Sequence, residues 1–171
     1  GEAVGEPTEC ALVNYATKLG LHKREIEKVA ARVGEAPFDS GRKMMSTVHV
    51  DGNAFVQFTK GAPDELLARC TKIIVNGAEV ELTDAYKAQI LAQNTEFASK
   101  ALRVLACAYK KHAVMPADCS PSALENDLVF IGLTGMIDPV RPEVKDAIVE
   151  CRNAGITPIM ITGDHINTAK A

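Results

Sequence analysis

One β-hairpin signal constrains the fold of this chain more than any other stretch. Residues 44–50 and 55–60 have the residue types of half-buried strands, and Asp51-Gly52-Asn53 between them is a turn sequence typical of hairpins. We therefore expect the two strands to pair antiparallel. Because they are of similar length and run in opposite directions, the pairing brings Arg42-Lys43, just before the first strand, to the same end of the sheet as Lys60.

The second of these strands ends at Lys60-Gly61-Ala62-Pro63, and helix formers follow. Gly61 permits a close approach of backbone or ligand, and Pro63 is tolerated in the first turn of a helix. A lysine beside the exposed amide groups at a helix start is a candidate anion site. A solvated lysine at a strand–helix turn explains the same residues, and this stretch alone favours that simpler interpretation.

Three other residues have two interpretations each. Phe38 is either a core residue or a stacking surface for a nucleotide base, and stacking of this kind contributes about 1–3 kcal/mol. Arg103 interrupts an apolar run, so it needs a carboxylate partner or a phosphate, and the sequence leaves both open. Glu9 lies in the first turn of a helix that Thr8 is expected to cap, where the helix dipole alone would explain a carboxylate.

The remaining pattern predicts alternating helices and strands. Apolar spacing predicts helices over residues 8–19, 22–33, 64–70 and 84–99, the last capped by Thr83; Asn76-Gly77 predicts a second hairpin, and residues 36–43 and 110–126 are expected to be loops. Residues 102–109 form an almost continuous apolar run, which predicts a strand covered on both faces.

The C-terminal part predicts a βαβ unit. Apolar strands are expected over residues 128–137 and 156–161, joined by a helix over residues 143–153. Asp138 and Asp164 then follow the carboxyl ends of the strands, where open α/β sheets carry their catalytic carboxylates. Because the last residues have the pattern of a helix interrupted in mid-course, we expect the chain to be a piece of a longer protein.

The composition excludes several classes of protein. Of 171 residues, 47% are hydrophobic and 24% charged, which is typical of a globular protein. The net charge of -3 does not provide the positive field of a nucleic-acid-binding protein, so we expect no nucleic-acid partner. Five scattered cysteines without a C-x-x-C pair argue against a zinc ribbon or a disulfide framework and fit a reducing cytosol. No apolar run approaches the roughly 20 residues that span a bilayer, so we expect no direct membrane insertion of this chain.

Six motifs follow one another at characteristic separations: Gly5-Glu6-Pro7-Thr8-Glu9, Phe38-Asp39-Ser40-Gly41-Arg42-Lys43-Met44-Met45-Ser46, Lys60-Gly61-Ala62-Pro63, Leu102-Arg103, Asp138-Pro139-Val140-Arg141-Pro142-Glu143-Val144 and Thr162-Gly163-Asp164. Each motif is weak alone. Together they show that the chain, from Gly5 to Ala171, resembles the nucleotide-binding domain of P-type cation-transporting ATPases with a downstream piece of their phosphorylation domain. It looks most like the calcium-pump branch.

The resemblance implies an α/β fold in two parts. Residues 1–127 would form the nucleotide-binding domain, an antiparallel sheet flanked by helices, and residues 128–171 a βαβ fragment of the parallel-sheet phosphorylation domain. The chain would be a cytoplasmic domain of an integral membrane protein that binds ATP, with magnesium used in the full-length pump. Its partners would be the actuator, phosphorylation and membrane domains of the same pump.

The resemblance also implies roles for particular residues. The aromatic ring of Phe38 would stack on adenine, Lys60 would lie along the pocket, and Arg103 would reach the polyphosphate. The complete set expected to bind nucleotide is Glu9, Phe38, Arg42, Lys43, Lys60, Gly61, Ala62 and Arg103. The set expected to help place the γ-phosphate is Asp138, Arg141, Thr162, Gly163 and Asp164. No residue of this chain is assigned as a metal ligand.

Two motifs of the family do not occur in this sequence. One is Asp-Lys-Thr-Gly-Thr, whose aspartate takes the phosphate, and the other is Gly-Asp-Gly-x-Asn-Asp, which helps bind magnesium. We therefore expect this chain to bind ATP without the turnover of the pump. Two alternatives stay open: a haloacid-dehalogenase-like phosphohydrolase fragment that uses Asp138 and Asp164, and a non-catalytic interaction domain in which Phe38 is core and the cations are solvated.

Overall fold

The computed structural model describes residues 4–137 and 141–161. Its centre is one seven-stranded sheet in the order β1-β2-β3-β6-β7-β4-β5. Within the described ranges the neighbouring strands are antiparallel, except that β4 and β7 are parallel. The strands are β1 (Arg32–Asp39), β2 (Met44–Asp51), β3 (Ala54–Gly61), β4 (Cys70–Val75), β5 (Ala78–Glu81), β6 (Arg103–His112) and β7 (Leu128–Met136).

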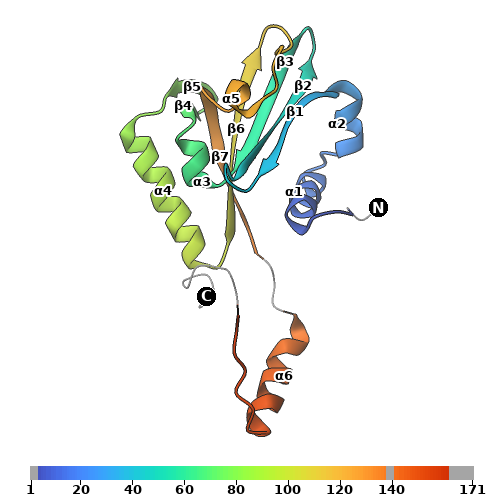
Figure 1. Ribbon diagram of the computed structural model, residues 1–171, viewed down its shortest axis with the longest axis vertical. Coiled ribbons are helices and arrows are strands. Elements are labelled where there is room, and N and C mark those ends of the chain that lie inside the picture. Colours follow the sequence, from blue (N-terminus) through green and yellow to red (C-terminus); the bar gives the residue numbers. More distant parts are fainter. Residues whose placement is uncertain (1–3, 138–140, 162–171) are drawn as a thin grey trace.

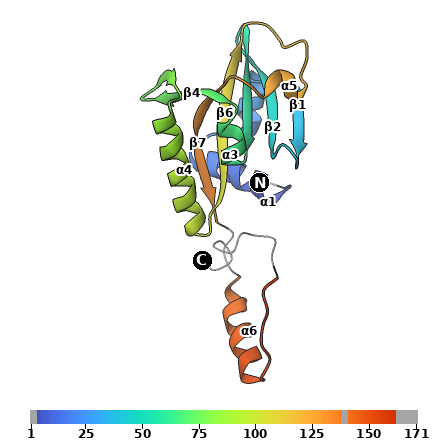
Figure 2. The ribbon, with the colours of Figure 1, turned by 60° about the vertical axis from the view of Figure 1, so that its left-hand side comes forward.

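Helices cover both faces of this sheet, which confirms the predicted α/β class with an antiparallel sheet flanked by helices. Helices α3 and α4 lie on one face, and α1 and α2 lie on the other (Figures 1 and 2). The helices are α1 (Pro7–Lys18), α2 (Lys23–Val29), α3 (Pro63–Leu67), α4 (Asp84–Ser99), α5 (Pro121–Leu124) and α6 (Pro142–Asn153). None of the helices in the described part of the chain combines the length and the apolar character needed to cross a lipid bilayer.

The two predicted hairpins are confirmed. In the first, β2 and β3 pair in a continuous register from Met44↔Gly61 to Asp51↔Ala54, with Gly52 of the turn at φ +59°. In the second, Asn76 and Gly77 both have positive φ, the backbone that a two-residue hairpin turn requires. Local turn chemistry was therefore sufficient to predict both pairings.

Strand β1 was not predicted from the sequence. The second helix was expected to reach residue 33, but α2 ends at Val29, and the first half of the expected loop belongs to an edge strand antiparallel to β2. Pro37 lies in this segment, and proline is common in loops. An edge strand tolerates proline, because the missing N–H faces no neighbouring strand.

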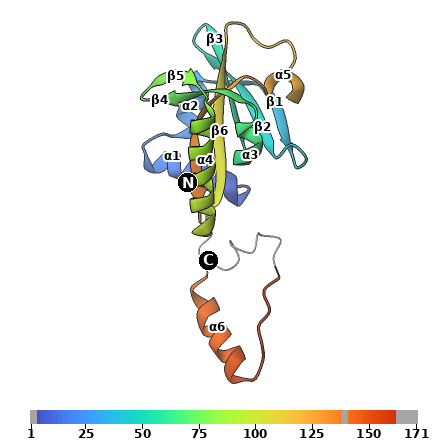
Figure 3. The same ribbon diagram turned by 90° about the vertical axis from the view of Figure 1, so that its left-hand side faces the viewer.

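Strand β7 is placed differently from the prediction. It was expected to begin a separate βαβ unit, but it pairs antiparallel with β6 and parallel with β4 inside the main sheet. Residues 156–161, the expected second strand of that unit, are exposed and form no strand. The predicted helix between them is present as α6, which extends away from the sheet (Figure 3).

The main hydrophobic core lies under α3 and α4. Ala106 and Ala108 of β6 are buried there beside Leu66 and Leu67 of α3, and Leu128 and Phe130 of β7 complete the cluster. Small alanine side chains let a helix approach the sheet closely. The opposite face is covered less completely, since α1 and α2 contain no buried residue, whereas α3 buries Pro63, Leu66 and Leu67.

Candidate functional site

Helix α1 meets two cations at the ends of neighbouring strands. Lys60, the second-last residue of β3, forms an ion pair with Glu9 of α1. Arg103, the first residue of β6, donates from Nη1 to the Thr8 hydroxyl at 3.0 Å. Because β3 and β6 are antiparallel, with Lys60 opposite Cys107, both cations lie at the same end of the sheet under the first turn of α1.

Thr8 therefore has a different role from the predicted one. The residue before the helix is Glu6, Pro7 occupies the first helical position, and no side chain caps this end. Pro7 suits that position because its missing N–H would have no partner within the helix. The Thr8 hydroxyl is consequently available to Arg103, for which the sequence left a carboxylate or a phosphate as the expected partner.

Gly61 brings the turn before β2 against the end of β3. It lies opposite Met44, and a Cβ atom built on Gly61 would be 2.5 Å from both the Lys43 carbonyl oxygen and the Met44 Cβ. The Ala62 amide donates to that same carbonyl at 2.9 Å. The close approach for which Gly61 is required is thus an approach of backbone to backbone, and it fixes the Lys43 main chain beside Lys60.

Phe38 is exposed at this end of the sheet. Strict alternation from the buried Ala36 would put Phe38 on the buried face as well. The β1–β2 register shifts by one residue between Ala36 and Asp39, and the Phe38 side chain is 63% exposed. The irregular register therefore turns a large aromatic ring out to solvent, which removes the interpretation of Phe38 as core.

Lys43 follows the turn in a left-handed conformation, with φ 55°. Its ammonium group is 3.1 Å from a carboxylate oxygen of Glu65 in α3. Hydrogen bonding to Glu65 and its negative charge raise the pKa of Lys43. Lys43 is therefore held in its charged form, with its ammonium group near α3.

The Arg42 head group lies on the other face of the sheet from Lys60. Arg42 pairs with Glu125, which is 3% exposed and within hydrogen-bond reach of the buried Ser46. Ser46 in turn bonds Thr59 across the strands. Since Thr59 and Lys60 are consecutive in β3, their side chains project to opposite faces. The structure thus brings Lys60, Arg103 and Glu9 together, but it does not bring the Arg42 guanidinium to them.

The remaining predicted residues lie far from this group or outside the described residues. Arg141 is exposed at the residue that precedes α6. Asp138, Thr162, Gly163 and Asp164 fall outside the described residues. The predicted set that places the γ-phosphate therefore stays a prediction.

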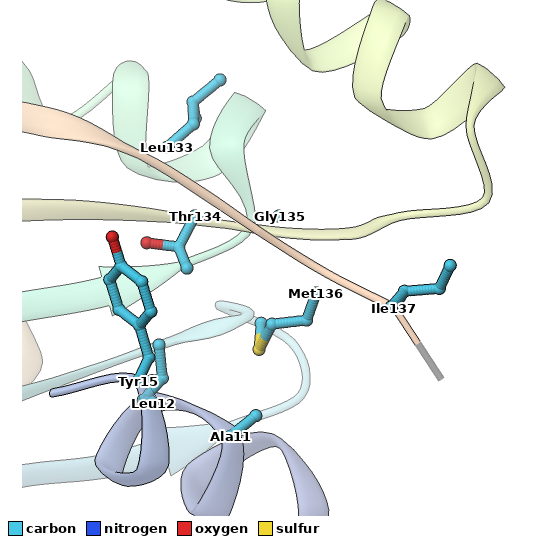
Figure 4. A pocket seen from close by; sticks show the side chains of 8 residues that line it. All are labelled: Ala11, Leu12, Tyr15, Leu133, Thr134, Gly135, Met136 and Ile137. Atoms are coloured by element: carbon cyan, nitrogen blue, oxygen red, sulfur yellow. The ribbon is translucent and has the colours of Figure 1, made fainter. Parts of the chain in front are cut away.

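A hollow of about 380 Å³ lies between α1 and the end of β7. Ala11, Leu12 and Tyr15 line it from the helix, and Thr134 and Met136 face them from the strand (Figure 4). Its lining is largely apolar, and it includes neither Phe38 nor Lys60. We therefore do not place a charged ligand in this hollow.

One side chain at the site has a shifted pKa as a consequence of burial. Cys107 lies directly opposite Lys60, and burial raises the pKa of its thiol, while the positive charge of Lys60 and a hydrogen bond from Thr134 act in the opposite direction. The effect of desolvation on the pKa is the largest of the three, so the Cys107 thiol beside Lys60 is neutral at pH 7. Among the described residues, Glu9 is the carboxylate that pairs with the Lys60 ammonium group.

Three residues important for this arrangement were missed in the sequence. Thr8 was interpreted as a cap, Glu65 as part of a helix without a role, and Glu125 as part of a loop. No local signal identifies Glu125. The only indirect one is that an arginine beside an apolar strand needs an anionic partner, and that partner is 83 residues away.

Comparisons with known proteins show which proteins this chain is similar to. A family model described as the cytoplasmic domain N of P-type ATPases matches residues 1–143. Calcium-transporting ATPase 1 of Bacillus cereus is 50% identical over 167 residues, which cover 98% of this chain and 19% of the relative. Calcium-transporting ATPase 1 of Lactococcus lactis is 44% identical over 171 residues, which cover 100% and 19%.

A relative with lower identity is named for a different cation. The potassium-transporting ATPase alpha chain 2 of Homo sapiens is 35% identical over 182 residues, which cover 98% of this chain and 17% of the relative. The chain thus spans about a fifth of the length of the curated relatives it matches, 19% for the two bacterial proteins.

Proposed function

Because this chain belongs to the P-type cation-transporting ATPases and spans their cytoplasmic N domain, we propose that it binds ATP at the sheet end described above. The proposed binding site would be bounded by α1, by the ends of β3 and β6, and by the turn between β1 and β2. The observation that supports this most is the convergence there of two cations, Lys60 and Arg103, with the exposed ring of Phe38 at the same end of the sheet.

Each residue has a physical role in this proposal. Phe38 stacks on the adenine ring, because an exposed aromatic ring gains by covering its face with another π-system. Lys60 and Arg103 attract the phosphates, and charge-assisted hydrogen bonds to them are the stronger kind. Glu9 lines the site beside Lys60, so incoming phosphates compete with the Glu9 carboxylate for Lys60. Lys43 would line it from the turn before β2, although its ammonium group pairs with Glu65 of α3 in the nucleotide-free chain. Gly61 and Ala62 hold the backbone close enough for these side chains to converge.

The described residues do not fit a resident magnesium ion. Within residues 4–137 and 141–161 no group of three or more His, Cys, Asp or Glu side chains is arranged to hold a metal. We propose that magnesium reaches this site bound to the phosphates of ATP.

In the whole protein, the bound ATP would donate its γ-phosphate to an aspartate outside this sequence. Asp138, Arg141, Thr162, Gly163 and Asp164 would help place that phosphate.

We propose that the nucleotide-binding domain ends after β7 rather than at residue 127, because β7 has strand partners on both sides in the main sheet. We propose calcium as the transported cation, since relatives with that name are 44–50% identical.

An NMR titration of the 171-residue chain with ATP tests the proposal. We expect the backbone amide signals of Phe38 and Lys60 to shift and the signals of α6 to stay in place. Absence of a shift at both Phe38 and Lys60 under saturating ATP would contradict ATP binding at this site.

Two parallel measurements separate the alternatives. Release of phosphate from small phosphoesters by this chain would favour a phosphohydrolase, whereas we expect none. An unchanged unfolding temperature at saturating ATP would favour a non-catalytic interaction domain, whereas binding to the folded state alone raises that temperature.

A further inference from the structure

We propose that Arg42 is a positioning residue, which acts on the nucleotide through Glu125 and the turn that carries Phe38, and does not itself contact the phosphates. This inference rests on the proposed function, since it concerns how the same pocket is held in shape. It assigns a role to Glu125, a buried carboxylate for which the binding of ATP gives no other reason.

Both terminal nitrogens of the Arg42 guanidinium group already have partners. Nη1 bonds both carboxylate oxygens of Glu125, and Nη2 donates to the Pro37 carbonyl at 2.7 Å. Only 24% of the side chain is exposed. To reach a phosphate on the Lys60 face, Arg42 would have to leave Glu125 as a buried, unpaired anion, which is strongly unfavourable.

These contacts fasten the turn from both sides of Phe38. The Pro37 carbonyl, just before Phe38, accepts from Arg42, and the Asp39 carboxylate, just after it, accepts from the Gly41 and Arg42 amides at 3.0 Å each. The backbone of Phe38 is therefore restrained while its ring stays exposed. A ring on a restrained backbone loses less conformational entropy when it stacks on adenine. The restraint of the turn therefore raises the affinity for the nucleotide.

Glu125 is fixed by the interior of the sheet, so it is a firm anchor for Arg42. Ser46 lies 3.5 Å from its Oε1 and bonds Thr59 at 2.8 Å. Gln57 then donates to Thr59 at 3.0 Å and to the carbonyl of Leu124, the neighbour of Glu125, at 2.9 Å. Within the described residues no buried side-chain nitrogen or oxygen lacks a partner, and such satisfied networks favour one arrangement over its alternatives.

The test compares ATP with adenosine in NMR titrations of wild-type chain, Arg42→Gln, Glu125→Gln and the double variant. A residue that positions Phe38 affects the adenine end, so each single change should lower affinity for ATP and for adenosine by the same factor, roughly tenfold. The double variant should lose no more than the single ones, because both changes release the same turn. Arg103→Gln serves as the reference for a phosphate contact and should weaken ATP more than adenosine.

A second measurement does not depend on nucleotide. Backbone amide relaxation of the ligand-free chain should give lower order parameters for residues 38–43 in Glu125→Gln than in wild type, with α4 unchanged. Glu125→Gln is the safer variant, because the amide keeps the shape of the carboxylate. Exposed Arg24→Gln in α2 is the matched control and should change neither readout.

The outcomes are distinct. A loss of affinity for ATP but not for adenosine in Arg42→Gln, in both the wild-type and the Glu125→Gln backgrounds, would mean that Arg42 contacts phosphate directly. Unchanged order of residues 38–43 in Glu125→Gln would also overturn the inference. A wild-type chain that binds neither ligand would refute the proposed function instead, and the relaxation measurement would still decide whether Glu125 holds the turn.

Discussion

Glu9 in α1 and Lys60 at the end of β3 form an ion pair across 51 residues of sequence. The Lys60 side chain is 26% exposed and that of Glu9 50% exposed. An ion pair so accessible to water contributes only about 0–1 kcal/mol to stability. Its main consequence is therefore to keep α1 and a cation together at the candidate site, with Glu9 as the anion that the phosphates of a nucleotide must outcompete.

Replacing Lys60 should affect binding more than stability. Lys60→Met should lower ATP affinity by roughly 1–3 kcal/mol, because a charge-assisted hydrogen bond to phosphate is lost. The unfolding free energy should change by less than about 1 kcal/mol. Titration calorimetry and urea unfolding measure the two effects. Lys72→Met is the matched control: Lys72 forms a comparable exposed ion pair with Glu79 at 3.3 Å in another part of the sheet, and its loss should leave ATP affinity unchanged.

Truncating Phe38 should also separate binding from stability. Phe38→Ala should lower ATP affinity by roughly 1–3 kcal/mol through lost stacking, and Phe38→Trp should restore most of it. Stability should change little, because the ring is largely exposed in the nucleotide-free protein. Leu91→Ala in α4 removes another exposed apolar side chain, and equal losses of affinity in Phe38→Ala and Leu91→Ala would show that the effect is not stacking.

Gly61→Ala should destabilise the fold. The new methyl group would be 2.5 Å from the Lys43 carbonyl oxygen, a backbone atom that cannot rotate away. Overpacking of this kind costs roughly 1–3 kcal/mol, measurable by urea unfolding. Gly132→Ala in β7 is the control, because nothing lies within 4 Å of its Cβ position, and its stability should stay within about 0.5 kcal/mol of wild type. Equal stability of the two variants would contradict this prediction, because it would mean that β2 and β3 move apart at little cost to accept the new methyl group.

The Tyr109–Glu79 pair should give a titration at high pH. The Tyr109 hydroxyl donates to the Glu79 carboxylate at 2.6 Å, which raises the pKa of Tyr109 to about 12. A raised pKa in the folded state means that the stabilisation is complete below the unfolded value, near 10, and is lost as pH rises through about 12.

Phenolate absorbance measures this titration, with circular dichroism to verify that the fold persists. In a Tyr15→Phe, Tyr86→Phe background, only Tyr109 contributes. Glu79→Gln should then bring the Tyr109 pKa down toward its ordinary value. A titration that is the same with and without Glu79→Gln would show that the carboxylate is not the cause.

Much of the local structure followed from residue types. Turn residues predicted the two hairpins, and the Thr83 cap, whose hydroxyl oxygen accepts from the Tyr86 amide at 3.4 Å, predicted the start of α4. The covered strand β6 followed from its apolar run. In each case the signal lies within a few neighbouring residues, which is the range over which turn geometry, capping and periodicity act.

The errors in the predicted fold arose where one sequence pattern is compatible with several neighbouring strands or with a loop. An apolar run such as β7 suits a strand covered on both faces, and it does not tell which strands lie beside it. Ile156–Ile161 is equally apolar, yet a strand needs a hydrogen-bonded neighbour, and none of the described residues pairs with it. β1 was missed because a proline in an edge strand resembles a proline in a loop.

The sequence by itself determined the local elements and, through its ordered motifs, the family and the chemical types of the residues at the site. Only the tertiary structure decided which of those residues meet: Lys60 pairs with Glu9 and Arg103 with Thr8, whereas Arg42 turns to Glu125 on the opposite face. The physical reason is that the partner of a charged side chain depends on which strands and helices pack together and on which face it projects. Those are long-range consequences of burial, and no short stretch of sequence contains them.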